Sequence, residues 1–163
     1  MRIVVQRVSR ARVTVGGEEV GAIGRGLLAL VGVERGDGRE QAMAAARKLA
    51  SMRVFEDAEG RMNLAAAEVG AAFLVVSQFT LAGSLARGRR PSFDAAAPPE
   101  VAEPLVEALV AALRAEGATV ATGRFRAYME VGLVNDGPVT FVLDVPPGAA
   151  AGAGAAPTTK PAR

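Results

Sequence analysis

The chain has 163 residues, half of them apolar, and its 19 basic and 17 acidic residues leave a formal net charge of only +2. That length suffices for one domain with a substantial core, and no apolar run is long enough to span a membrane. Histidine and cysteine are both absent, which excludes Ser-His and Cys-His nucleophiles and zinc sites built on those side chains, so no metal or other cofactor is expected.

Short β-rich runs bounded by turn residues predict most of the elements. Predicted strands cover residues 3–8, 11–15, 18–23, 26–33, 54–55, 71–77, 119–122, 128–134 and 139–145. The run 26–33 is almost entirely apolar and too short for a typical helix, which indicates a strand buried on both faces. The charged first strand does not resemble a signal peptide. We therefore expect a soluble cytoplasmic protein.

Two helices separate these strands. Asp37 stands where an N-capping residue is expected, and apolar residues at helical spacing follow it, so the first helix should cover 38–53. A second apolar stripe predicts a helix that ends near Gly117. Pro104 falls inside that helix, so its first turn should be irregular or its start late. Strand-rich halves with two separate helices indicate an α+β fold rather than a βαβ repeat.

Composition also divides the chain and marks one basic segment. Residues 1–146 should form the folded domain, whereas the Ala/Gly/Pro-rich residues 147–163 should be a disordered tail. All but two of the basic residues are arginine, which GC-rich codon usage alone can explain. The cluster Arg87, Arg89 and Arg90 nevertheless has the character of a local phosphate-binding patch.

Hydroxyl and amide groups gather where an apolar strand ends, at Ser77, Gln78, Phe79 and Thr80. One interpretation is an ordinary strand end, since most Ser and Thr residues take no part in chemistry. The other is catalytic. A strand that breaks into a loop exposes consecutive backbone N–H groups, which can stabilise an oxyanion without any histidine.

A second segment, Asn135-Asp136-Gly137-Pro138, lies between two β-rich runs. It is compatible with a simple hairpin loop, although a proline directly after Asp-Gly removes a donor from the strand pairing. The alternative is a cis Gly137–Pro138 bond, because cis is accessible to X-Pro bonds at small cost. Its two carbonyl groups could then point the same way, into a pocket.

Arg7 is in phase with the apolar residues of the first strand. Its side chain could extend from the strand end to solvent. Alternatively, it could be held inward and bind backbone carbonyl groups or phosphate.

Taken together, the motifs resemble the D-aminoacyl-tRNA deacylase family in its D-tyrosyl-tRNA deacylase form. The resemblance covers about residues 1–145, and Ser-Gln-Phe-Thr and Asn-Asp-Gly-Pro-Val-Thr are its most specific elements. The segments that carry it stand in one order: residues 6–8, 11–15, 26–28, 55–63, 77–81, 90–93, 122–125 and 135–141.

This resemblance implies a homodimer with β-barrel-like sheets, two helices and an active site at the subunit interface. It implies hydrolysis of the ester that links a D-amino acid to the terminal adenosine of tRNA, and release of glycine from mischarged tRNA. Residues 77–80 would line the scissile ester, with their backbone N–H groups polarising its carbonyl. Phe125 and Met129 would lie near the adenosine and the aminoacyl group.

Chirality selection is also implied by the resemblance. Gly137 and Pro138 match the family's Gly-cis-Pro element, which reaches into the partner's pocket and excludes L-amino acids, and Arg7 would fix that element. The ribose 2′-hydroxyl of the tRNA would take the place of a protein base. An older proposal makes the threonine at the position of Thr80 a nucleophile, but no side chain of this sequence is a convincing base for it.

The sequence departs from the family's pattern at Arg126, where a small residue is usual, at Tyr128, and at Pro104. Two other classes of function compete with the deacylase. One is an RNA-binding dimer without activity, against which the intact motifs argue. The other is an esterase with Ser77 or Thr80 as nucleophile, against which the missing base argues.

Overall fold

The structure is a computed structural model that describes residues 1–146, so the predicted tail of residues 147–163 lies outside the described residues. Its strands are β1 (Arg2–Val15), β2 (Glu18–Ile23), β3 (Gly26–Gly32), β4 (Phe55–Glu56), β5 (Met62–Leu64), β6 (Ala72–Ser77), β7 (Val120–Thr122) and β8 (Glu130–Asp144). Its helices are α1 (Arg39–Ser51) and α2 (Pro99–Ala115), with two 3-10 turns, η1 (Ala66–Val69) and η2 (Phe79–Ala82).

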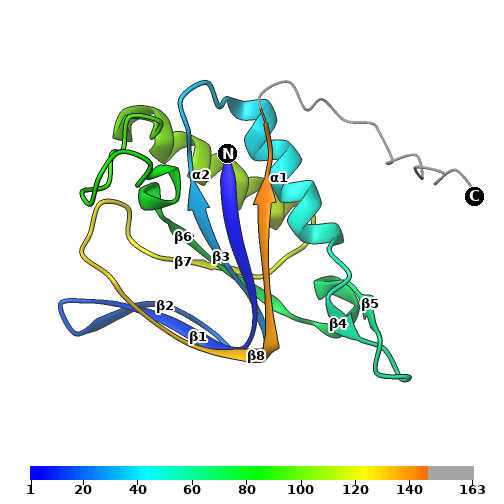
Figure 1. The fold of residues 1–163 in the computed structure, drawn as a ribbon. Helices are drawn as coiled ribbons and strands as arrows, with labels where there is room; N and C mark the ends of the chain where they lie inside the picture. Colours follow the sequence, from blue (N-terminus) through cyan, green and yellow to red (C-terminus); the bar gives the residue numbers. More distant parts are fainter. Residues whose placement is uncertain (147–163) are drawn as a thin grey trace, which may run out of the picture.

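Six strands form one sheet (Figure 1). Five of them follow the order β2-β1-β3-β6-β7, and the sixth, β8, pairs with β1 along nearly its whole length. The two ends of this order approach each other. A Cβ atom at Gly21 in β2 would collide with the backbone oxygen of Thr122 in β7. The sheet is therefore barrel-like and nearly closed, and it carries two helices, as predicted. The βαβ arrangement that the sequence argued against is nevertheless present, because β3, β6 and β7 are parallel neighbours and α1 and α2 lie in the connections between them.

The core consists of two apolar clusters on opposite faces of the sheet. The larger one joins Leu27, Ala29 and Val31 of β3 to both helices, and the smaller one contains Leu28 and fills the barrel. Because successive side chains of a strand point to opposite faces, β3 contributes to both clusters. Its burial on both faces is confirmed. Within residues 1–146, neither helix is long and apolar enough to cross a membrane.

Two interruptions predicted from the sequence are absent. The predicted strands 3–8 and 11–15 are one strand, β1, because β8 and other partners continue its pairing through the polar residues between them. The hairpin between 128–134 and 139–145 is also absent. Both runs pair with β1, so they belong to one strand, β8, and the residues between them form a bulge in it.

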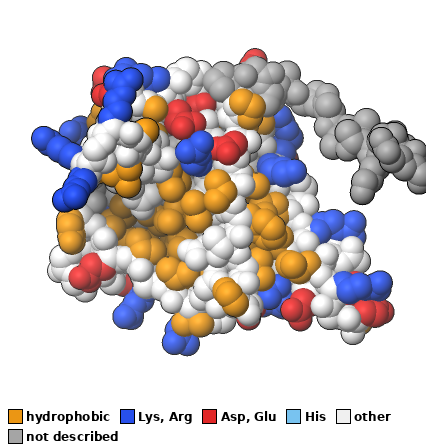
Figure 2. Space-filling view, in the orientation of Figure 1, with side chains coloured by type: hydrophobic (Ala, Val, Ile, Leu, Met, Phe, Trp, Pro, Cys, Tyr) orange, Lys and Arg blue, Asp and Glu red, His pale blue; other side chains and the backbone are white. Residues whose placement is uncertain are grey.

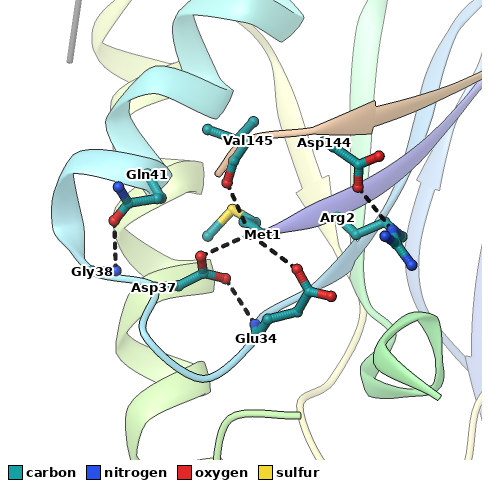
Figure 3. Close-up of polar contacts among 8 residues, drawn as sticks. All are labelled: Met1, Arg2, Glu34, Asp37, Gly38, Gln41, Asp144 and Val145. Carbon is teal, nitrogen blue, oxygen red and sulfur yellow. Dashed lines mark hydrogen bonds and ion pairs between the residues drawn. The ribbon is translucent and has the colours of Figure 1, made fainter. Parts of the chain in front are cut away.

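Asp37 is not the N-cap of α1, because its carboxylate is used elsewhere (Figure 3). It accepts a hydrogen bond from the Met1 ammonium group at 2.7 Å and another from the Glu34 N–H at 2.7 Å. Gly38 caps the helix instead, and its N–H donates to the Gln41 side chain at 2.8 Å. The sequence therefore predicted the turn before α1 correctly, but the role it gave to the Asp37 carboxylate is wrong.

Other contacts of the first two residues fasten the start of β1 to the end of β8 (Figure 3). The Met1 ammonium also donates to the Val145 carbonyl at 3.0 Å. One residue further, Arg2 donates to the Asp144 carboxylate at 2.8 Å, and this hydrogen bond raises the pKa of Arg2 above its ordinary value.

The sequence allowed α2 either an irregular first turn or a late start, and the late start is wrong. It begins at Pro99, a tolerated first helical position, and continues through Pro104. Pro104 cannot donate to the Glu100 carbonyl. Both residues are exposed, so water can serve that carbonyl in place of the missing N–H.

Candidate active site

The segment with the hydroxyl groups leaves the sheet at the end of β6. Gln78 donates its N–H to the Val31 carbonyl of β3 at 2.7 Å, and η2 starts at the next residue. The N–H of Leu81 closes this turn on the Gln78 carbonyl. The first N–H groups of such a turn, those of Phe79 and Thr80, have no acceptor within it. They are available to a ligand carbonyl.

A cavity of about 690 Å³ opens beside this segment. Ser77, Gln78 and Phe79 line one side, and Phe125 and Met129 come from the chain that leads into β8. The structure thus brings together five residues that the sequence predicted for the site. Figure 2 shows hydrophobic side chains gathered across this face, between the loop before α2 and strands β1 and β8.

Thr80 lies beside the cavity rather than in its lining. Its hydroxyl accepts a hydrogen bond from the Gln78 side-chain amide, and an amide cannot act as a base. Within residues 1–146, no three His, Cys, Asp or Glu side chains gather as a metal site requires.

The walls of the cavity include residues that the sequence did not point to. Most are small and apolar, and they come from β3, β6, β8 and α2 or from the residues next to β3 and α2: Val31, Val33, Val76, Ala97, Pro99, Ala102, Val106 and Val131. In the sequence such residues cannot be distinguished from ordinary core positions. Arg126 and Tyr128, noted only as departures, also line it.

Gly137 and Pro138 lie in the bulge of β8, defined here as residues 136–139. Gln6 of β1 pairs with Thr140 of β8, and Val8 pairs with Asn135, so residues 136–139 of β8 lie opposite the one residue between Gln6 and Val8. The Gly137–Pro138 bond is cis, as predicted. Asn135 closes the base of the bulge through hydrogen bonds with the Val139 carbonyl at 3.1 Å and the Val139 N–H at 3.0 Å.

Arg7 is held inward against the bulge. Its residue is only 5% exposed. The guanidinium donates to the Asp136 carbonyl at 3.1 Å and to the Val54 carbonyl at 2.8 Å. It also lies 3.6 Å from the Glu56 carboxylate. Of the two interpretations of Arg7, binding to backbone carbonyls is confirmed, and the arginine connects the bulge to the residues before β4.

The bulge and the cavity lie apart in a single chain. Among the described residues, none of those lining the cavity belongs to residues 135–139, and none is Arg7. The predicted residues thus fall into two groups, one around Ser77 and one around Gly137.

Comparison with known proteins identifies the family. The family model described as D-Tyr-tRNA(Tyr) deacylase matches residues 4–144. This chain belongs to that deacylase family. The family assignment confirms the predicted resemblance and the prediction of an enzyme that hydrolyses carboxylic esters.

Individual relatives agree with this deacylase assignment. The D-aminoacyl-tRNA deacylase of Anaeromyxobacter dehalogenans is 62% identical over 144 residues, which cover 88% of this chain and 97% of that protein. The D-aminoacyl-tRNA deacylase of Symbiobacterium thermophilum is 60% identical over 144 residues, covering 88% and 95% of the two chains.

Two solved structures share the fold of this deacylase-family chain. One, described as a c-Myc DNA unwinding element binding protein, is 41% identical with a TM-score of 0.84, and the match covers 90% of this chain and 99% of that one. The other, described as a probable eukaryotic D-amino acid tRNA deacylase, has a TM-score of 0.72 at 19% identity, covering 88% and 98%. The second likeness is evidence of the fold alone.

Proposed function

We propose that this chain is a D-aminoacyl-tRNA deacylase that hydrolyses the ester between a D-amino acid and the 3′-terminal adenosine of tRNA. It also releases glycine from mischarged glycyl-tRNA, and so acts in proofreading of translation in the cytoplasm. The observation that carries the proposal is the cavity in which Ser77, Gln78 and Phe79 meet Phe125 and Met129. Family membership over residues 4–144 supports it independently.

Catalysis rests on backbone groups and on the substrate. The ester carbonyl lies against the N–H groups of Phe79 and Thr80, which stabilise the negative charge on its oxygen as water attacks. The ribose 2′-hydroxyl assists the attack, and the 3′-oxygen leaves with a proton. Thr80 is not the nucleophile, because its hydroxyl contacts the Gln78 amide rather than a base. The chemistry proposed needs no cofactor.

The bulge of β8 selects chirality. Carbonyl oxygens at Gly137 and Pro138 occupy the space that an L side chain needs, which rejects the L isomer by collision and by leaving polar oxygens unsolvated. Glycine has no side chain and escapes this rejection. Since the bulge and the cavity are apart in one chain, the bulge acts on the cavity of a partner chain, with Arg7 fixing its position.

A homodimer accounts for the outer face of β8. This strand pairs with β1 on one side, and no other described strand pairs with its second edge. Leu133, Val134, Phe141 and Val142 along it are 36–61% exposed. A long apolar edge strand left open invites association. A second copy covers it and brings its own bulge to the cavity.

The loop between η2 and α2 supplies contacts for the tRNA backbone. Arg87, Arg89 and Arg90 are exposed there, and none takes part in an ion pair within residues 1–146. The Phe93 ring of this loop packs on Phe79, with centroids 5.0 Å apart. Exposed guanidinium groups on the loop that also carries Phe93 suit phosphates of the bound tRNA.

The direct test compares matched D- and L-tyrosyl-tRNA and follows release of tyrosine. We expect release from the D substrate only, and equal release with and without EDTA. Hydrolysis of a simple ester such as p-nitrophenyl acetate, with no preference for D-tyrosyl-tRNA, would identify a free-standing esterase instead. Tight tRNA binding without any release would identify an RNA-binding protein without activity.

A further inference from the structure

One aromatic ring at the cavity is far more exposed than an aromatic side chain usually is. Tyr128 lines the cavity and yet is 90% exposed. It is the only tyrosine of the chain, which has no tryptophan. An exposed ring contributes little to the stability of the folded protein, because it removes little apolar surface from water. Its position at the cavity mouth therefore needs another explanation.

The backbone is anchored on both sides of Tyr128. Ala127 and Met129 both line the cavity, and Met129 packs on the core cluster inside the barrel. Before them, the N–H of Ala127 closes a turn on the Arg124 carbonyl at 3.2 Å. Directly after Met129, β8 begins. Tyr128 is therefore an exposed ring on an anchored segment.

We infer that Tyr128 stacks on the base of the penultimate nucleotide of the aminoacyl-tRNA. This inference rests on the proposed deacylase function. The ester must reach Phe79, so the terminal aminoacyl-adenosine fills the apolar interior and the preceding nucleotide leaves through the mouth. Unpaired bases at an RNA end are bound by aromatic rings in this way, whatever their sequence.

Arg126 supports this position of the penultimate nucleotide at the cavity mouth. It lines the cavity two residues before Tyr128, is exposed, and has a positive φ of 60° that turns the chain sharply at the mouth. A guanidinium beside an exposed ring fits a nucleotide, because the ring takes the base and the cation takes the phosphate.

The composition of the chain provides a specific readout. Tyr128 is the only tyrosine and tryptophan is absent, so the intrinsic fluorescence near 300 nm comes from this residue. Titration of the protein with the dinucleotide cytidylyl-adenosine should quench it, whereas adenosine monophosphate should not. Quenching by adenosine monophosphate would assign the ring to the terminal base, and would overturn the inference.

Kinetics of two variants complete the test. Tyr128→Ala should raise KM for D-tyrosyl-tRNA about tenfold, as expected for loss of one base stack, while Tyr128→Phe, which keeps the ring, should retain the wild-type KM. The rise should be absent with D-tyrosyl-adenosine, which lacks the penultimate nucleotide. An equal KM for all three proteins on D-tyrosyl-tRNA would overturn the inference. Tyrosine fluorescence that changes when the protein is diluted, but not when the dinucleotide is added, would also overturn it.

These outcomes separate the inference from the proposed function. Wild-type protein that hydrolyses neither D-tyrosyl-tRNA nor D-tyrosyl-adenosine contradicts the deacylase itself. Wild-type protein that hydrolyses both, with an unaffected Tyr128→Ala variant, contradicts only the role of Tyr128.

Discussion

The cavity and the bulge are built in opposite ways. The cavity is assembled from five elements, and its chemical groups are backbone N–H groups released where β6 ends and η2 starts. The bulge is one interruption in one strand. Asn135 closes its base, and the buried Arg7 fastens it to the rest of the fold through the Asp136 and Val54 carbonyls. In the proposed enzyme the first region carries out hydrolysis and the second chooses the substrate.

This difference means that the two activities can be damaged separately. Loss of the backbone N–H donors at the cavity should remove hydrolysis of every substrate. Changes at the bulge should leave hydrolysis and remove the choice between D and L. A protein in which both properties always fall together would contradict this division.

The largest effect is expected from Phe79→Pro. Proline is tolerated at the first position of a helical turn but has no N–H, so the variant loses one proposed oxyanion donor. We expect hydrolysis of D-tyrosyl-tRNA to fall about 100- to 1,000-fold. Phe79→Ala also removes the ring but keeps the N–H, and should retain much more activity. If both variants were equally impaired, the ring rather than the N–H would be the important group.

Gly137→Ala tests the bulge. Gly137 has a φ of 130°, and a Cβ there would lie 2.7 Å from the Val139 side chain and 3.2 Å from the Arg7 guanidinium. The bulge must move, and we expect the ratio of D- to L-tyrosyl-tRNA hydrolysis to fall about tenfold or more, equivalent to about 1.4 kcal/mol.

Gly132→Ala in the same strand is the matched control for this change. Its added Cβ would meet only the flexible Arg12 side chain, at 3.7 Å. The control should keep the wild-type ratio. A Gly137→Ala variant with unchanged discrimination would show that the bulge is not the filter.

Arg7→Met should lower stability as well as discrimination. It leaves the Val54 and Asp136 carbonyls without their donor in a nearly buried position. We expect the free energy of unfolding to fall by about 2–4 kcal/mol, measured by urea denaturation. Arg10→Met, an exposed arginine on the same strand, should change it little. Equal effects of the two substitutions would contradict the anchoring role of Arg7.

The smallest effect is expected from Thr80→Ala. If backbone N–H groups and the ribose 2′-hydroxyl carry out the chemistry, this variant should lose at most a few-fold in rate. D-Tyrosyl-tRNA that ends in 2′-deoxyadenosine should be a very poor substrate for the wild type. The reverse pattern, a dead variant and a cleaved deoxy substrate, would restore Thr80 as nucleophile.

The sequence predicted local patterns better than long-range pairing. The two faces of β3 were predicted correctly because alternation and apolar content are local properties. The continuity of β8 was not, because it depends on pairing with a strand more than a hundred residues away. Asp37 failed as a cap for the same reason, since its partner is the distant Met1 ammonium.

Site residues followed the same rule. Ser77, Gln78 and Phe79 could be found because polar groups at the end of an apolar strand are conspicuous. Ala102 and Val106 of α2 could not, because a small apolar residue that walls a cavity looks like any core residue. The separation of Gly137 from Ser77 within one chain is a property of the folded structure alone.

The central claim is that the cavity of one chain works with the bulge of its partner. Mixed dimers test it directly. They are formed by co-expressing Gly137→Ala chains with an excess of Phe79→Pro chains, and they are purified through a tag on the Gly137→Ala chain. Each working cavity then belongs to a Gly137→Ala chain and faces an intact partner bulge. We predict that the mixture hydrolyses D-tyrosyl-tRNA and regains the wild-type rejection of L-tyrosyl-tRNA. Hydrolysis of L-tyrosyl-tRNA at the level of the Gly137→Ala homodimer would contradict the claim, because the bulge would then act within its own chain.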